Sequence, residues 1–480
     1  MGPWAMRLLV VAAHLLLALV VTAHIVQTKA DVRSAIGWAG LVWLTPVVGA
    51  VLYALFGINR IRRQAGQMRR GRALWWRDPV RSVVVRPGET ALPDGVSPAA
   101  RPLATLVGAA TGAPLVAGNV VHPLVNGDEA YPAMLAEIEG ATQSIAMTTY
   151  IFDRGQVADQ FVDALARAVQ RGVIVRVLID GVGARYSRPP MIRTLRAHGI
   201  TVARFLPPLI PWPHPYFNLR NHRKLLVVDG KVGFCGGLNV RDGCMLALNP
   251  LMPTRDLHFR IRGPVVGQMM SAVAFDWAFA TREQLAGPAW FPPLFSSGPV
   301  LGRGIRGGPD EDFETLLMTF LGALSQATQS IRIATPYFLP DSPLIDALQV
   351  AALRGVRVEI VMPERGNLLF VQWAAAAQLW QIVRWGCHVY LSPPPFDHSK
   401  LLVVDGEWSL IGSANWDPRS LRLNFEYGVE CYSTDLAARL GAVFEAKLAG
   451  ARLVTVADIE RRSFPVRLRD GLAWLAQPYL

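Results

Sequence analysis

The chain has 480 residues, of which 51% are hydrophobic and only 18% are charged, and its net charge is +12. This length predicts two or three domains, and the composition is typical of a membrane protein or an apolar-rich globular protein. The basic residues are concentrated, because nine arginines lie between residues 60 and 86 against a single acid, Asp78. A nucleic-acid-binding protein would spread its basic residues over a working surface. A cluster that directly follows an apolar stretch indicates instead a segment that flanks a membrane.

Two apolar stretches near the N-terminus are long enough to cross a bilayer. Residues 8–28 and 34–59 contain no Asp, Glu, Lys or Arg, and roughly 20 apolar residues suffice for a membrane-spanning helix. We expect a hairpin of two transmembrane helices over residues 1–60, with Pro46 kinking the second, and a basic linker over residues 61–118. The alternative for the first stretch is a cleaved signal peptide. In either case the arginine cluster places everything that follows it on the cytoplasmic side.

The rest of the chain is an internal duplication. The sequence Ala-Thr-Gln-Ser-Ile at residues 141–145 recurs at residues 327–331, and a strand-like run follows each copy. A helical pattern comes next in both copies, then Arg-Gly-Val and a second apolar strand. Strands that alternate with helices predict an α/β fold, here two duplicated lobes over residues 119–300 and 301–480 with pseudo-two-fold symmetry. A site that both lobes share would lie at their interface.

Each lobe carries the pattern His-x-Lys-x4-Asp. It spans residues 222–229 in the first lobe and 398–405 in the second, and an Asn follows seventeen residues after each His. An acidic residue then opens a further strand in both lobes. One such match could arise by chance, but two matches in a duplicated frame make chance a poor explanation. The candidate site residues are His222, Lys224, Asp229, His398, Lys400 and Asp405 as the catalytic set, Asn239 and Asn415 as ligands of a phosphate, and Asp256 and Glu426 as acids that orient the histidines.

These residue types suit the transfer of a phosphoryl group. A two-residue spacing puts His and Lys on the same face of a strand, where the ammonium can neutralise a phosphate and an Asn can donate hydrogen bonds to its oxygens. One histidine can attack phosphorus, while the other protonates the leaving alcohol and then deprotonates the incoming one. Each imidazole needs an acid on its second nitrogen, and we expect Asp229 and Asp405 to brace the turns after their strands. We predict no cofactor and no metal, because the lysines supply the positive charge and the four scattered cysteines form no C-x2-C pair.

These motifs resemble those of the phospholipase D superfamily and, within it, the bacterial cardiolipin synthases. The likeness covers nearly the whole chain and is carried by residues 218–224, 236–239, 335–341, 412–415, 419–420 and 424–426. Phe396 and Asp397 depart from it, since the family more often has small or apolar residues before the second histidine. The resemblance implies a phosphatidyltransferase of the bacterial inner membrane, multi-pass and with cytoplasmic lobes. It would join two molecules of phosphatidylglycerol into cardiolipin and release glycerol, with His222 as nucleophile and His398 as acid and base.

The acceptor of the phosphatidyl group stays open at this point. If water is the acceptor, the protein is a hydrolytic phospholipase D that releases phosphatidic acid. A nuclease of the same superfamily fits poorly with two membrane spans and a juxtamembrane arginine cluster, so we expect no nucleic-acid partner. A tethered binding protein with a dead site is opposed by intact His, Lys and Asn residues in both lobes. The expected partners are phosphatidylglycerol and an anionic phospholipid membrane, and the sequence does not indicate an oligomeric state.

Overall fold

The computed structural model describes residues 2–29, 31–57, 92–206, 219–309, 312 and 314–477. The chain divides into two compact units, Met1–Met68 and Arg69–Leu480, and each is described by itself. The arginine cluster between residues 60 and 86, which we expect to flank a membrane, lies outside the described residues.

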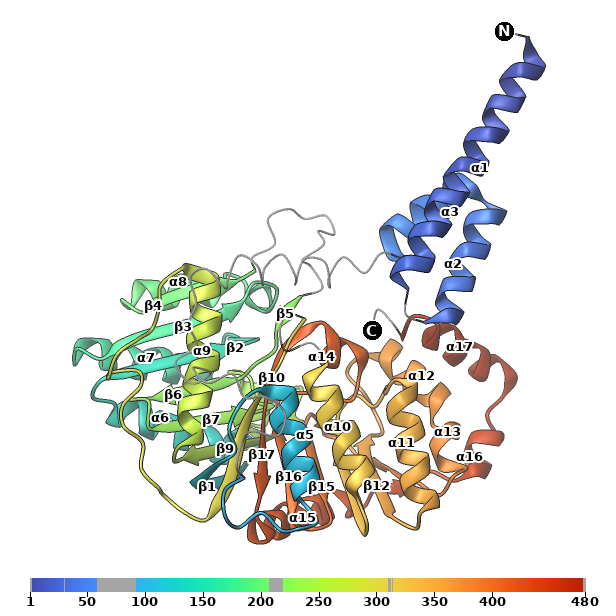
Figure 1. The fold of residues 1–480 in the computed structure, drawn as a ribbon. Coiled ribbons are helices and arrows are strands. Elements are labelled where there is room, and N and C mark those ends of the chain that lie inside the picture. The colour runs from blue at the N-terminus through green and yellow to red at the C-terminus, as the bar shows by residue number, and fades with distance from the viewer. Residues whose placement is uncertain are drawn as a thin grey trace. The chain divides into compact units, whose positions relative to one another are not determined.

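The first unit is helical (Figure 1). Its elements are α1 (Pro3–Thr28), α2 (Val32–Leu44), α3 (Pro46–Leu52) and the π-helical turn η1 (Tyr53–Gly57). Within the described ranges, α1 alone is long and apolar enough to cross a membrane as one helix. The second apolar stretch is interrupted where a kink at Pro46 is expected, because the chain breaks between α2 and α3 at Thr45 (φ −141°, ψ 75°). A second membrane span stays a prediction. Pro46 causes the break, since it lacks an N–H and pushes the preceding residue out of the helical region.

The second unit is built on a sheet whose two halves repeat the same strand order. From one edge to the other the order is β18-β13-β12-β11-β15-β16-β17-β10 and then β1-β9-β7-β6-β2-β3-β4. The first lobe contributes β1 (Val116–Val125), β2 (Ser144–Thr149), β3 (Ile174–Asp180), β4 (Thr201–Phe205), β6 (Leu225–Val228), β7 (Val232–Gly236) and β9 (Leu257–Arg262). The second contributes β10 (Val300–Gly307), β11 (Ser330–Ala334), β12 (Arg357–Pro363), β13 (His388–Ser392), β15 (Leu401–Val404), β16 (Trp408–Gly412), β17 (Asn424–Tyr432) and β18 (Arg452–Leu453). β1 and β10 pair antiparallel and so join the lobes. The predicted duplication in an α/β fold is confirmed.

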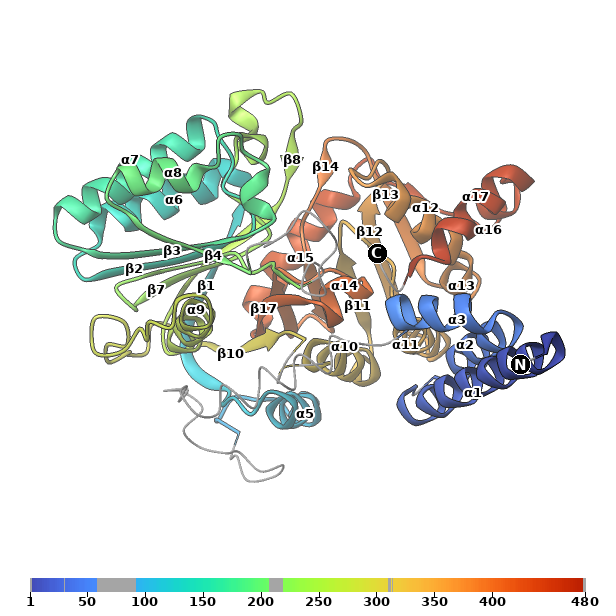
Figure 2. The ribbon, with the colours of Figure 1, turned by 90° about the horizontal axis from the view of Figure 1, so that it is seen from above.

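Helices cover both faces of each half of the sheet (Figure 2). The first lobe has α6 (Asn126–Gly140), α7 (Gln156–Gln170) and α8 (Met191–Ala197), with α9 (Val265–Thr281) on the opposite face. The second has α10 (Thr315–Gln326), α11 (Ser342–Leu353), α12 (Leu369–Gln378), α13 (Trp380–Val383), α14 (Pro418–Arg422), α15 (Thr434–Leu448), α16 (Val456–Glu460) and α17 (Phe464–Trp474). Because both faces are covered, the strands that follow the two lysines are apolar throughout and fully buried, as Leu-Leu-Val-Val in β6 and in β15.

The part of the chain that we expect to be a linker contains a packed helix. Residues 101–111 form α5 (Arg101–Thr111), which packs against α10 of the second lobe. Leu103, Ala104 and Val107 of α5 are buried in that lobe's core. The linker prediction is therefore wrong for this stretch, because a short stripe of small apolar residues is enough to dock a helix on a larger core.

Candidate active site

The two motif histidines are held by short strands that cross from one lobe to the other. β5 (Arg220–Asn221), just before His222, pairs parallel with the start of β17 in the second lobe. β14 (Phe396–Asp397), just before His398, pairs parallel with β8 (Thr254–Arg255) in the first. The backbone N–H of His222 donates to the carbonyl of Phe425 at 2.9 Å, and that of His398 donates to the carbonyl of Arg255 at 2.7 Å. Each histidine is thus fixed to the opposite lobe by its own main chain.

The orienting acids also act across the interface. Nδ1 of His222 lies 2.9 Å from Oε1 of Glu426, and Nδ1 of His398 lies 2.7 Å from Oδ2 of Asp256. The two imidazole rings lie 6.5 Å apart between centroids and are nearly perpendicular, at 84°. The structure therefore brings the predicted histidines and acids of both lobes into one site. Because each acid binds Nδ1, the nitrogen left for chemistry on each ring is Nε2.

Burial keeps both histidines neutral, and the neighbouring histidines and lysines keep both acids charged. Burial lowers the pKa of His398 to about 4, against the opposing effect of Asp256, and it also lowers the pKa of His222. Burial raises the pKa of Glu426, but the neighbouring His222 and Lys224 outweigh it and the net shift is downward. The pKa of Asp256 is likewise lowered overall, by His398 and a lysine. A neutral imidazole that donates Nδ1–H to a carboxylate presents a lone pair on Nε2, as a nucleophile or base requires.

The two lysines lie beside the histidines, as their two-residue spacing predicts. Nζ of Lys224 donates to the carbonyl of His222 at 2.7 Å, and Nζ of Lys400 donates to the carbonyl of His398. Burial lowers the pKa of Lys224 to about 7 and that of Lys400 to about 8, while both acids of the site oppose the effect. Lys400 also lowers the pKa of Lys224, which shows that the two cations share one confined space. A bound anion would relieve that repulsion, so the site is electrostatically suited to a phosphate.

The two predicted phosphate ligands are buried just after equivalent strands, Asn239 after β7 and Asn415 after β16. Oδ1 of Asn239 accepts a hydrogen bond from the N–H of Ile151 at 3.0 Å, which fixes the direction of its amide. The backbone N–H of Asn415 donates to Oγ of Ser420 at 2.9 Å, and its side chain bonds Asp417. Their role as ligands of a phosphate stays a prediction.

Asp229 and Asp405 do not belong with the catalytic side chains. Each lies at the far end of the strand that follows its lysine, with a positive φ of 51°. Asp229 accepts hydrogen bonds from three successive backbone N–H groups, at residues 142–144, over 2.7–3.2 Å. Asp405 binds residues 328–330 in the same way, at 2.8 Å. Both aspartates therefore brace a turn by binding its backbone N–H groups, as expected. We assign them this structural role and no catalytic one.

Two serines belong to the site although the sequence did not single them out. Oγ of Ser413 donates to Oε2 of Glu426 at 2.5 Å, and Oγ of Ser420 donates to Oε1 at 2.6 Å. The first lobe has Gly237 where the second has Ser413, and a Cβ at Gly237 would come within 2.1 Å of Asp256. Glu426, the longer acid, thus accepts hydrogen bonds from two hydroxyl groups. Asp256, the shorter acid, has room beside it because residue 237 is a glycine. The sequence did contain a signal, because the two residues before the motif asparagine differ between the lobes. They are Gly-Leu before Asn239 and Ser-Ala before Asn415.

Aromatic rings lie beside the histidines, a role that was not predicted from the sequence. The Tyr150 ring lies edge-on to His222 at 5.4 Å, and Nζ of Lys224 lies 5.6 Å from its centroid. The Tyr337 ring lies edge-on to His398 at 6.3 Å. Each ring places apolar surface beside its imidazole.

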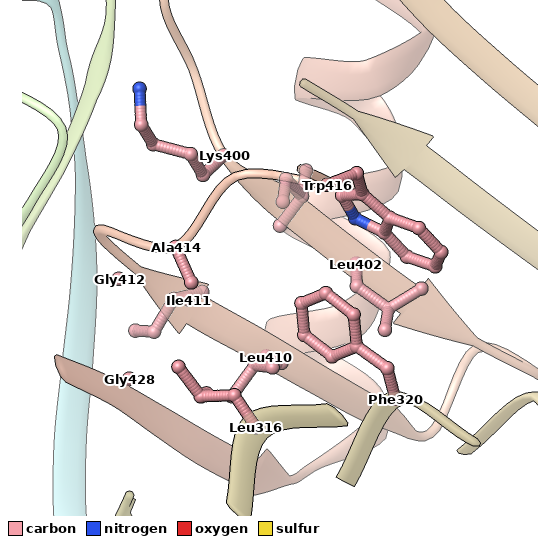
Figure 3. A pocket seen from close by; sticks show the side chains of 11 residues that line it. Leu316, Phe320, Lys400, Leu402, Leu410, Ile411, Gly412, Ala414, Trp416 and Gly428 are labelled. Atoms are coloured by element: carbon pink, nitrogen blue, oxygen red, sulfur yellow. The ribbon is translucent and has the colours of Figure 1, made fainter. Parts of the chain in front are cut away.

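A small apolar pocket lies behind the second motif (Figure 3). It is enclosed by α10 and strands β15 to β17, and Lys400 turns its ammonium away from the apolar side chains. The pocket shares only Lys400 with the site, so it is packing space behind the site. Within the described residues, no group of three or more His, Cys, Asp and Glu side chains is placed to hold a metal ion. The absence of a metal requirement stays a prediction.

Comparison with known proteins agrees with this geometry. A family model described as "Cardiolipin synthase, PLD-like domain" matches residues 134–249 and 320–448, and one described as "Phospholipase_D-nuclease N-terminal" matches residues 16–57. The fold and the paired motifs thus define a phospholipase D-like protein. The cardiolipin synthase of Geobacillus kaustophilus is 32% identical over 100% of this chain and 96% of its own. The major cardiolipin synthase ClsA of Bacillus subtilis is 31% identical over 97% of each chain. The chain belongs to the cardiolipin synthase family, and the resemblance seen in the sequence is confirmed.

The fold is also found in a solved structure. Phosphatidylserine synthase of Haemophilus influenzae superposes with a TM-score of 0.62, covering 80% of this chain and 100% of that one. The two sequences are 15% identical, so the match concerns the fold alone.

Proposed function

We propose that this cardiolipin synthase joins two molecules of phosphatidylglycerol into cardiolipin and glycerol through a phosphohistidine intermediate. The observation that carries the proposal is the crossed pair of histidines, each with an acid on Nδ1 and a lysine beside it. Family membership supports the product, and the two buried lysines support an anionic phosphodiester as the substrate.

In the first half-reaction, Nε2 of His222 attacks the phosphorus of the donor. A P–N bond forms, the P–O bond to the headgroup glycerol breaks, and Nε2–H of His398 protonates the departing oxygen. The negative charge of the bound phosphodiester favours the protonated His398 that this step requires. Glu426 supports the choice of His222, because three side-chain donors (Ser413, Ser420 and Asn424) hold this carboxylate against the ring that becomes cationic on phosphorylation.

In the second half-reaction, a hydroxyl of the second phosphatidylglycerol takes the place of the glycerol that has left. Nε2 of His398 removes its proton, the oxygen attacks phosphorus, and the P–N bond to His222 breaks. Both histidines return to their starting states. Lys224 and Lys400 carry the charge on the phosphate oxygens, and Asn239 and Asn415 donate hydrogen bonds to them.

The first unit is proposed to anchor the enzyme. α1 has the length and apolarity of a membrane span. From residue 34 onward the broken series α2, α3 and η1 contains no Asp, Glu, Lys or Arg, and broken helices are tolerated in membranes. We propose that the two segments cross the inner membrane as a hairpin and that the arginines after residue 60 keep the lobes in the cytoplasm. Anchoring would hold donor and acceptor at high local concentration, which favours transfer over hydrolysis.

The reaction can be tested in vesicles of phosphatidylglycerol that contain the purified protein and a metal chelator. We expect cardiolipin and free glycerol in equal amounts, with phosphatidic acid as a minor product. Phosphatidic acid as the main product, with cardiolipin absent, would show a hydrolytic phospholipase D. A strict requirement for a divalent metal would refute the role given to the lysines.

A further inference from the structure

The last helix of the chain has its apolar side facing outward. Phe464, Leu468, Leu472 and Leu475 recur at helical spacing along α17 and its C-cap, and their exposed fractions are 67%, 50%, 59% and 68%. The charged Asp470, by contrast, is buried with only 1% exposed. An ordinary surface helix shows the opposite pattern. A continuous exposed apolar stripe of this kind marks a surface that binds something.

The orientation of α17 is fixed by polar contacts on its inner side. Asp470 forms ion pairs with Arg462 and with Arg469. Arg462 also donates to the carbonyl of Ala376 on α12 at 2.9 Å, and the guanidinium of Arg469 lies 4.5 Å from the ring centroid of Trp373. These contacts tie α17 to α12 (Figure 1). The stripe is therefore held outward by the fold.

A second exposed apolar group leads from α12 toward the catalytic histidine. Leu368, Leu369 and Phe370, at the start of α12, are 51%, 61% and 46% exposed. The preceding residue, Asn367, accepts a hydrogen bond from the hydroxyl of Tyr337 at 2.7 Å. The Tyr337 ring in turn lies against His398. Two contacts, from Asn367 to Tyr337 and from Tyr337 to His398, thus connect these exposed apolar side chains with the active site.

The polar side chains around the stripe are basic. Residues 461–477 contain four arginines and one aspartate, a net charge of +3, and the aspartate is buried in its ion pairs. Arg461 and Arg467 are exposed, whereas Arg462 and Arg469 already pair with Asp470. Apolar side chains flanked by arginines fit the boundary between the acyl chains and the headgroups of an anionic bilayer.

We propose that α17 and the first turn of α12 form a docking surface that rests on an anionic phospholipid bilayer. Leu468 and Leu472 would sink into the acyl boundary, the arginines would bind lipid phosphates, and the start of α12 would hold the entrance beside His398 at the level of the headgroups. The proposal goes beyond the anchor in the first unit, because it fixes which face of the catalytic unit meets the membrane. It rests on the proposed function only in taking a lipid as substrate.

A depth measurement tests the docking directly. The four native cysteines are all buried, so Leu468→Cys gives a single exposed thiol for a fluorescent label. With the full chain in phosphatidylglycerol vesicles, we expect blue-shifted emission and quenching by nitroxide groups on the lipid chains. Asp163→Cys, on the exposed side of α7, is the matched control and should not be quenched. An unquenched label at residue 468 overturns the proposal. A blue shift without lipid quenching also overturns it, because it shows that protein covers the stripe.

An activity ratio tests the consequence for catalysis. Leu472→Glu should lower the ratio of turnover on bilayer phosphatidylglycerol to turnover on short-chain phosphatidylglycerol in detergent, by roughly 10-fold or more. Leu353→Glu changes a similarly exposed leucine at the end of α11 and should leave the ratio unaltered. Equal ratios in the two variants would refute the docking surface. Failure of the native protein to form cardiolipin from either substrate would refute the proposed function instead, and the quenching result would stand independently.

Discussion

The Glu426→Gln substitution should impair catalysis far more than it impairs folding. Gln has nearly the same shape, but it cannot provide the carboxylate that orients His222. Its amide has one oxygen, whereas Ser413 and Ser420 donate to both oxygens of the native carboxylate. One serine hydroxyl would therefore face an NH2 group. If the NH2 instead turned toward His222, it would favour the tautomer with hydrogen on Nε2, which cannot attack phosphorus.

The expected loss follows from these contacts. A hydrogen bond to a charged group contributes about 1.5–3 kcal/mol, and a buried hydroxyl without its acceptor costs about 1–2 kcal/mol. Together these amount to ~2.5–5 kcal/mol, or a fall in kcat of ~10²–10⁴-fold. Loss of the negative charge should also lower the pKa of Lys224 further below about 7, because Glu426 raises it in the native site. The alkaline limb of kcat/KM should therefore move to lower pH.

The assay is cardiolipin formation in phosphatidylglycerol vesicles at a series of pH values, with thermal unfolding of each variant as a check on the fold. Ser413→Ala keeps the carboxylate and removes one donor, so it should lose only ~10-fold. Glu445→Gln removes an exposed ion-paired acid and serves as the control. Activity of Glu426→Gln within a few-fold of native, with the alkaline limb unmoved, would refute the crossed orientation of His222.

Three further outcomes follow from the same site. Burial lowers the pKa of Lys224 to about 7 and that of Lys400 to about 8, so both lysines are charged below these values. In vesicles, kcat/KM for the anionic donor should therefore fall as the pH rises from 7 to 9. Asp405→Ala removes the acceptor for three backbone N–H groups and should lower the stability by about 2–4 kcal/mol, while the folded fraction keeps near-native turnover. With a phosphatidyl ester of p-nitrophenol, a leaving group that needs no proton, His398→Ala should give a burst of nitrophenolate, and His222→Ala should give none; a burst from His222→Ala would reverse the roles.

The duplicated fold could be predicted from the sequence because the repeated motifs are long and match in both residue type and spacing. The crossing of the lobes was not predictable, because β5 and β14 are only two residues long and show no periodicity. Without that crossing, Glu426 and Asp256 could be recognised as orienting acids but not assigned to a particular histidine. Ser420 was part of the recognised motif but was given no role for a related reason, since its role depends on the fold of α14 around Asn415.

Two stretches were described incompletely by composition. Residues 34–59 have no charged side chain and a kink was expected at Pro46, but the extent of the break between α2 and α3 could be seen only in the structure. The stretch that includes α5 is rich in Pro, Gly and Ala and shows little periodicity. Its helix is stabilised by the core of the second lobe, and that tertiary contribution is invisible in a local pattern.

The exchange of acids between lobes bears on how such a protein could have arisen. One lobe alone holds a histidine without its acid and an acid without its histidine, so a one-lobe ancestor would have needed a second copy of itself to catalyse the reaction. In such a homodimer the two acids would have been identical by symmetry. A chain that joins two copies is free of that constraint, and here one acid is a glutamate held by serines and the other an aspartate beside a glycine. Divergence of the halves thus allows two chemically identical side chains to take different tasks.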